Sequence, residues 1–253
     1  MLQHWCHFRI VLLLLALPWP ARGETPPVLD FTTMAREAKQ SGDCAVTFDD
    51  GPGPHTGQLL DILASKQVKA TFFVLGEHVR RFPDLVRRMV AEGHEVENHS
   101  WDHPDMRKLD EAARQKEIED TVALLRSLGV EPHFFRPPYG AYDAALVEQA
   151  RRDGLQLVLW TRDSLDWRYH TVAQLEGDVL TRGSGANGVF LFHDIHDGTI
   201  AAMPVMLDDL RAKGCRFTTV AQWVDDGNRA IGAPPVVSPV TVPAKSRGWL
   251  RFF

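Results

Sequence analysis

The alternation of short apolar runs with amphipathic stretches constrains the fold of this chain more than any other feature of its sequence. The apolar runs are rich in Val, Phe and Thr and are mostly bounded by Gly, Pro or Asp, which is typical of strands. The predicted strands are Cys44–Phe48, Ala70–Val74, His94–Glu97, His133–Phe135, Leu155–Trp160, Val189–Phe192 and Cys215–Val220.

Hydrophobic residues recur at helical spacing between these strands. The predicted helices are Thr56–Gln67, Pro83–Gly93, Asp110–Leu128, Asp143–Arg152, Val172–Thr181 and Ile200–Lys213. Strand alternating with helix in this way predicts a parallel β/α architecture. One domain over residues 41–226 accounts for all of these elements.

The two ends of the chain are predicted to lie outside this domain. Residues 1–23 contain basic residues, an apolar run over Ile10–Leu17 and a small-x-small sequence. This run is far shorter than the roughly 20 residues that span a bilayer, so we interpret the segment as a cleaved secretory signal, with an uncleaved anchor as the alternative. Residues 24–40 are predicted to be a leader and residues 227–253, with four Pro, a poorly ordered tail. The mature chain is then secreted or periplasmic, with no membrane span.

Charge and cysteine content exclude several classes of protein. The 253 residues carry a formal net charge of −5, which argues against a nucleic-acid binder because such proteins normally show a basic face. The 3 Cys are too few for a disulfide scaffold or a Cys-rich zinc module. Signal cleavage leaves Cys44 and Cys215, which begin the first and last predicted strands. We predict a disulfide between them, and a monomer is favoured.

Polar and ionisable residues directly follow five of the predicted strands. The five clusters are Thr47–Pro52, His99–Pro104, Arg136–Gly140, Asp163–Trp167 and Leu191–Asp194. In a β/α barrel the carboxyl ends of the strands converge on one face. We therefore expect these clusters to meet in space although they are far apart in sequence.

The first two clusters contain the residue types of a metal site. His99 and His103 are four residues apart, which would place both imidazoles on one side of a helical turn. Together with a carboxylate from the Asp49-Asp50 pair they supply three N/O ligands and leave an open position, the composition of a catalytic zinc site. Each cluster alone also fits a structural role, since an Asp can cap a helix and a His pair can occupy an ordinary loop.

The remaining clusters add groups suited to acid–base chemistry and sugar binding. Arg136 can hold a carboxylate, Trp167 can stack on a sugar ring, and His193 emerges from an apolar strand. Asp163 and Asp166 are two further acids in the same cluster as Trp167. Taken singly, each fits a Pro-rich turn, a solvated loop or a structural histidine, so the functional interpretation depends on the five clusters agreeing.

In order and spacing the five clusters resemble the motifs of NodB-type polysaccharide deacetylases, carbohydrate esterase family 4, from about Cys44 to Val220. The resemblance implies a distorted (β/α)7 barrel and metal-dependent removal of acetyl groups from N-acetylated sugar polymers. It implies that Asp49 is the general base, held by Arg136, and that His193 is the general acid. It also implies that Asp50, His99 and His103 bind the metal and that the backbone N–H of Tyr139 contributes to the oxyanion hole. Asp166, placed directly before Trp167, is a better candidate than Asp163 for orienting His193.

The expected cofactor is a divalent metal, most simply Zn²⁺, although Co²⁺, Ni²⁺ and Mn²⁺ accept the same N/O ligands. The expected partner is an N-acetylated glycan such as peptidoglycan, a chitin-like polymer or an exopolysaccharide. An O-acetyl esterase acting on xylan or another glycan is the alternative enzyme, and a non-catalytic carbohydrate-binding protein is a second alternative. The other histidines, His94 among them, are predicted to lie in loops or on the surface.

Overall fold

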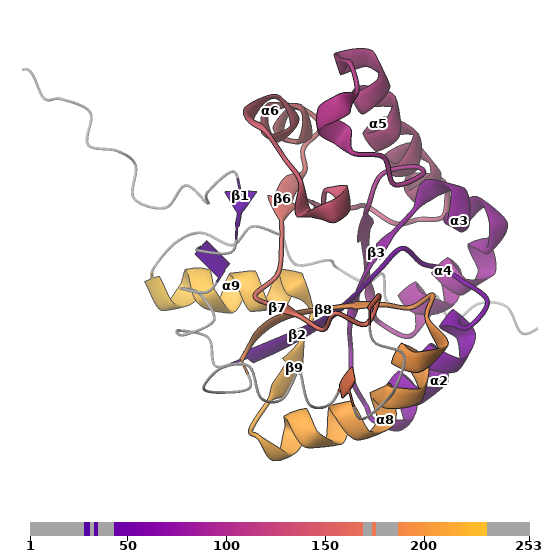
Figure 1. Ribbon diagram of the computed structural model, residues 1–253, viewed down its shortest axis with the longest axis vertical. Coiled ribbons are helices and arrows are strands. Elements are labelled where there is room, and N and C mark those ends of the chain that lie inside the picture. Colours follow the sequence, from indigo (N-terminus) through magenta and orange to yellow (C-terminus); the bar gives the residue numbers. More distant parts are fainter. Residues whose placement is uncertain (1–27, 31–32, 35–42, 169–173, 176–186, 232–253) are drawn as a thin grey trace, which may run out of the picture.

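The computed structural model describes residues 28–30, 33–34, 43–168, 174–175 and 187–231 (Figure 1). The predicted signal segment and most of the predicted tail lie outside these residues, as does most of the predicted helix Val172–Thr181. No helix in the described part is long and apolar enough to cross a membrane.

The described strands form one sheet in which every recorded pairing is parallel. They are β1 (Val28–Leu29), β2 (Asp43–Asp49), β3 (Thr71–Val74), β4 (Glu95–Asn98), β5 (Phe134–Phe135), β6 (Gln156–Val158), β7 (Arg162–Asp163), β8 (Gly188–His193) and β9 (Arg216–Thr218). The order is β1-β6-β5-β4-β3-β2-β8-β7, with β9 also paired to β2.

The helices are α2 (Thr56–Ser65), α3 (Gly76–Arg81), α4 (Pro83–Ala91), α5 (Glu111–Ser127), α6 (Ala144–Arg152), α8 (Asp197–Ala212) and α9 (Val220–Ile231). Two 3-10 helices cover Met106–Lys108 and Pro138–Gly140. The sheet curls and the helices surround it (Figure 1), while hydrogen bonds between described strands leave β1 and β7 at its two ends. This incompletely closed single-domain barrel is the predicted distorted β/α fold.

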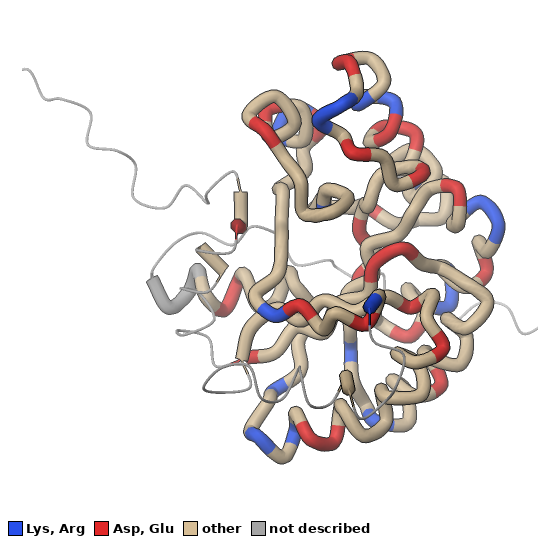
Figure 2. The backbone as a smooth tube through the Cα atoms, in the orientation of Figure 1, with Lys and Arg blue, Asp and Glu red and all other residues tan. Residues whose placement is uncertain are grey.

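Acidic and basic positions are interspersed along α5 (Figure 2).

The two faces of β2 explain how apolar packing and the polar site coexist. Alternate side chains of a strand point to opposite faces. Val46 and Phe48 point into the main apolar core, which also contains residues of α2 and α8. The Phe48 ring lies 5.3 Å from that of Phe72, and complete burial of such a side chain contributes about 1.5–3 kcal/mol. The opposite face of β2 carries Thr47 and Asp49 into the barrel interior.

Regular secondary structure is present outside the predicted limits of 41–226 at both ends. Within the predicted leader, Val28 pairs with Leu157 of β6, and Met34 is completely buried. At the other end α9 continues to Ile231, past the predicted start of the tail at residue 227. Leu29 and Met34 belong to the buried core, a contribution that hydrophobic periodicity does not reveal.

The structure bears on two further expectations, the disulfide and the position of His94. Cys44 and Cys215 form the predicted disulfide, with their Cα atoms 5.6 Å apart, because β9 pairs with β2. His94 was expected in a loop or on the surface; it lies in the connection between α4 and β4, but it is buried there rather than exposed. His94 is 7% exposed, and its Nδ1 accepts a hydrogen bond from the N–H of Ala70.

Candidate active site

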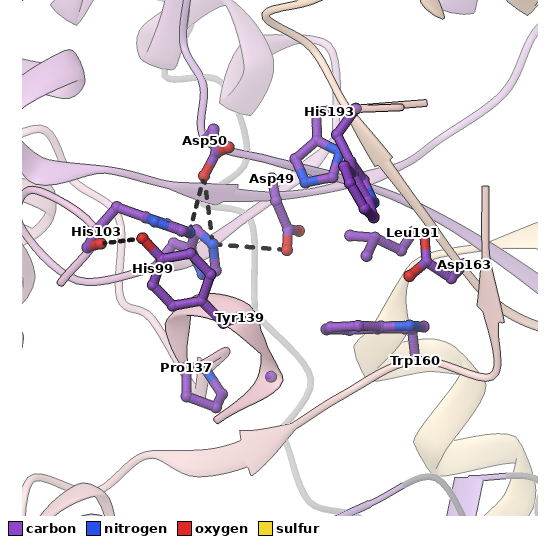
Figure 3. A pocket seen from close by; sticks show the side chains of 12 residues that line it. Asp49, Asp50, His99, His103, Pro137, Tyr139, Trp160, Asp163, Leu191 and His193 are labelled. Carbon is purple, nitrogen blue, oxygen red and sulfur yellow. Dashed lines mark hydrogen bonds and ion pairs between the residues drawn. The ribbon is translucent and has the colours of Figure 1, made fainter. Parts of the chain in front are cut away.

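A pocket of about 470 Å³ opens where the carboxyl ends of the strands converge (Figure 3). All five clusters predicted from the sequence contribute to it. Its lining residues are Asp49, Asp50, His99, His103, Pro137, Tyr139, Gly140, Trp160, Asp163, Trp167, Leu191 and His193. The sheet topology therefore brings together segments separated by more than a hundred residues.

Asp50, His99 and His103 form a group that could hold a metal ion. One ligand atom from each lies within 4.8 Å of the others. The Nε2 atoms of both histidines are 3.5 Å from Asp50 Oδ1. Ligands about 2.1 Å from a tetrahedral zinc ion are about 3.4 Å apart, so the spacing fits. Asp50 Oδ1 is also buried and accepts no hydrogen bond from the described residues, as expected of a ligand atom.

Hydrogen bonds and neighbouring charges give these side chains the orientation and protonation state that suit a cation. The Nδ1–H of His99 donates to the carbonyl oxygen of Arg136 at 2.7 Å, which directs Nε2 toward Asp50. Burial alone would raise the pKa of Asp50, but the charges of His99, His193 and His103 outweigh it and hold this pKa well below its ordinary value. Burial, reinforced by the charge of His99, lowers the pKa of His103, which favours the neutral imidazole that binds metals.

The prediction of a helical turn between the two histidines is wrong. Residues 99–104 form an irregular loop in which Ser100 has φ 77° and His103 has φ 66°. The imidazole rings still approach to 5.1 Å between centroids. A spacing of four residues is thus compatible with a loop, because contacts with other elements set the backbone conformation.

Asp49 lies beside the metal-ligand group but is held by a different partner. Arg136 is completely buried and donates from Nη1 to Asp49 Oδ1 and to Thr47 Oγ1, both at 2.7 Å. Its Nη2 donates to the carbonyl oxygen of Leu159 at 2.8 Å. The other carboxylate oxygen, Asp49 Oδ2, is 3.7 Å from His99 Nε2. A buried carboxylate paired with a buried guanidinium in this way is held in one position.

Asp166, rather than Asp163, contacts His193. The Nδ1 of His193 lies 2.7 Å from Asp166 Oδ1, while Asp166 Oδ2 accepts from the His193 backbone N–H and from Thr199 Oγ1, also at 2.7 Å. Burial opposes protonation of His193, but Asp166, with Asp49 and Asp50, raises the pKa of His193 to about 9. The imidazole is therefore protonated at neutral pH. Asp163 instead accepts a backbone hydrogen bond from Leu165 at 2.9 Å.

Aromatic residues form the rim and one wall of the pocket. Tyr139 is 68% exposed and Trp167 is 53% exposed. Tyr139 has φ 62°, and its ring meets that of His103 edge-on with centroids 4.5 Å apart. A Cβ on Gly140 would lie 2.9 Å from the Trp160 ring, so glycine is required for this close approach. Sequence reasoning missed Trp160, whose only signal is its place at the end of a predicted strand.

Asp194 is a second residue whose surroundings sequence reasoning did not anticipate. Its side chain is completely buried, and Asp194 Oδ2 accepts a hydrogen bond from Thr56 Oγ1 at 2.5 Å. Burial raises the pKa of Asp194 to about 7. A Cβ on Gly51 would lie 2.2 Å from either oxygen of this carboxylate. The segment after Asp50 therefore packs directly on the residue that follows His193.

Comparison with known proteins identifies the family. Residues 36–158 match the family described as polysaccharide deacetylase. The chain is 39% identical over 182 residues to a peptidoglycan-N-acetylglucosamine deacetylase of Bacillus cereus, an alignment that spans 68% of this chain and 67% of that protein. It is 37% identical over 196 residues to a chitooligosaccharide deacetylase of Rhizobium leguminosarum bv. trifolii, spanning 70% of this chain and 89% of the relative.

A solved structure agrees with these sequence matches. The family 4 carbohydrate esterase from Streptomyces lividans, in complex with acetate, has a TM-score of 0.65 and 37% identity. The match covers 70% of this chain and 91% of the esterase. The chain therefore belongs to the polysaccharide deacetylase family, carbohydrate esterase family 4, a family of enzymes whose named members here are deacetylases.

Proposed function

We propose that this protein is a metal-dependent hydrolase that removes acetyl groups from N-acetylglucosamine units of a glycan outside the cytoplasm. One observation carries the proposal. The three candidate metal ligands line a single pocket together with Asp49, which Arg136 holds, and His193, which Asp166 holds. The peptidoglycan and chitooligosaccharide deacetylases among its relatives support an N-acetylated glycan as substrate.

Asp50, His99 and His103 would hold the cation, and their one carboxylate and two imidazoles suit Zn²⁺, with Co²⁺, Ni²⁺ or Mn²⁺ as alternatives. When bound, a divalent cation of this kind polarises the acetyl carbonyl and lowers the pKa of a coordinated water. The chain's own residues must then accept a proton, stabilise negative charge on the carbonyl oxygen, and return a proton to the leaving nitrogen.

Asp49 is the proposed general base. Water forms a bond to the acetyl carbonyl carbon while one of its protons passes to the carboxylate of Asp49. Arg136 supports this role because its Nη1 holds Asp49 Oδ1, leaving Oδ2 beside the metal-ligand group. As negative charge develops on the former carbonyl oxygen, the backbone N–H of Tyr139 donates a hydrogen bond to it.

His193 is the proposed general acid. Its raised pKa of about 9 keeps a proton available at neutral pH, and the ring lines the pocket. Transfer of that proton to the amide nitrogen accompanies cleavage of the carbon–nitrogen bond, which yields acetate and a free amino group on the sugar. Asp166 fixes the ring orientation through Nδ1, and Trp167 at the rim offers a flat surface for a sugar ring.

The test is acetate release by the purified chain with added Zn²⁺. N-acetylglucosamine oligomers, peptidoglycan and O-acetylated xylan are supplied separately, and His193→Ala is the matched variant. We expect release from the N-acetylated substrates and a loss of at least ~100-fold in turnover in His193→Ala, without loss of bound metal. Release from xylan alone would support the esterase alternative. No release from any substrate would support a binding protein, which needs neither Asp49 nor His193.

A further inference from the structure

The loop between the two histidines determines how the proposed metal ligands face one another. Ser100, Trp101 and Asp102 connect His99 to His103 without helical or strand hydrogen bonding. Ser100 and His103 both have positive φ, a conformation that residues other than glycine seldom adopt. Such a backbone persists only when surrounding groups hold it.

Two of those surrounding groups are backbone N–H groups of α3. The N–H of Gly76 donates to the carbonyl oxygen of Ser100, and the N–H of Glu77 donates to that of Trp101, both at 3.0 Å. The Trp101 side chain packs so tightly against α3 that a Cβ on Gly76 would lie 2.3 Å from its ring. These contacts satisfy carbonyl oxygens of the loop but leave its N–H groups to other partners.

A carboxylate from α5 takes two of those N–H groups. Glu117 Oε2 accepts hydrogen bonds from the N–H of Trp101 at 2.8 Å and of Asp102 at 3.2 Å. Glu117 is half-buried, and α5 also accepts a hydrogen bond from Asn98 Nδ2 through the carbonyl oxygen of Ile118, at 3.0 Å. The end of β4, directly before His99, and the middle of the histidine loop are thus both attached to one turn of α5.

We propose that Glu117 is a positioning residue that fixes the histidine loop in its metal-binding conformation and so sets the affinity of the metal site. This inference rests on the proposed metal site. His103 directly follows the two residues that Glu117 holds, so movement of their backbone would displace His103 Nε2 from its 3.5 Å separation from Asp50. Groups that support ligands from outside the coordination sphere typically change metal affinity 10–100-fold.

The test measures Zn²⁺ affinity of the metal-free full chain by calorimetric competition with a chelator. Glu117→Met keeps the length of the side chain but leaves two N–H groups without an acceptor, whereas Glu117→Gln keeps a carbonyl acceptor. Glu119→Met, on the exposed side of α5, is the matched control because Glu119 bonds only to Gln115 among the contacts recorded for its side chain. We expect about 10-fold weaker binding in Glu117→Met, near-complete recovery in Glu117→Gln and no change in Glu119→Met.

Unfolding of the metal-free variants separates positioning from a general structural role. A residue that merely supported the fold would lower stability without changing the Zn²⁺ affinity of the folded protein, and that result would overturn the inference. If Glu117→Met does not fold, Glu117→Asp replaces it. Its shorter side chain should weaken Zn²⁺ binding, whereas Glu117→Gln should not. Wild-type affinity in Glu117→Asp would then overturn the inference. Absence of Zn²⁺ binding by the wild-type chain would instead refute the metal site itself, and this inference with it.

Discussion

Replacing Asp166 with Asn is expected to lower the pKa of His193 and to move the alkaline limit of activity to lower pH. The carboxylate of Asp166 is the largest influence that raises this pKa, acting against burial of the ring. A pKa of about 9 in place of the ordinary 6.5 corresponds to about 3 kcal/mol in favour of the imidazolium. Loss of a contacting opposite charge typically shifts a pKa by about 1–3 units, so we expect a decrease of about 2.

Two measurements test this expectation. NMR titration of the metal-free chain reports the pKa of His193 directly, and the pH dependence of acetate release reports it in the working enzyme. The acid must be protonated to act, so a lower pKa moves the alkaline limb to lower pH. A bound cation repels the imidazolium, so the wild-type limb should lie below the pKa of the metal-free protein.

Stability of the metal-free chain gives an independent reading with a defined sign. Because the folded-state pKa of His193 is raised, its contribution to stability is complete below the unfolded value of about 6.5 and is lost as pH rises through about 9. Asp166→Asn should remove most of this pH dependence. Asp163→Asn is the control, since Asp163 shares the pocket but bonds to Leu165. A pKa of His193 that stayed near 9 in Asp166→Asn would refute the reasoning.

Four further variants have distinct expected outcomes. Asp50→Asn should weaken metal binding, with partial recovery of activity in excess metal. Asp49→Asn should keep the metal and stay inactive. Loss of metal in Asp49→Asn would mean that the two roles are reversed. Replacing both Cys44 and Cys215 with Ser opens a loop of 171 residues and should lower the free energy of unfolding by up to about 5 kcal/mol, measured by denaturant titration. Gly51→Ala forces a Cβ against a buried carboxylate and should cost about 1–3 kcal/mol, seen as a lower midpoint of thermal unfolding.

The order of most strands and helices, and the place of the polar clusters at strand ends, could be predicted from the sequence, whereas α3, α9 and the short strands β1 and β7 were not. Apolar runs and helical periodicity are local signals, and in a parallel β/α fold they oblige the carboxyl ends of the strands to share one face. Asp49, His99, Arg136, Asp166 and His193 could therefore be assigned to one site before any contact was known. The disulfide followed from the same reasoning, because its cysteines begin the first and last predicted strands.

Only the tertiary structure decided which of these residues touch one another. The place of Asp166 directly before Trp167 favoured it over Asp163, but the contact itself depends on the packing of β8 and α8, which brings His193 and Thr199 to Asp166. The conformation between His99 and His103 likewise depends on α3 and α5, so a spacing of four residues could not reveal a loop. Such contacts join elements distant along the chain, and their geometry arises from packing and hydrogen bonds that no local pattern of residues records.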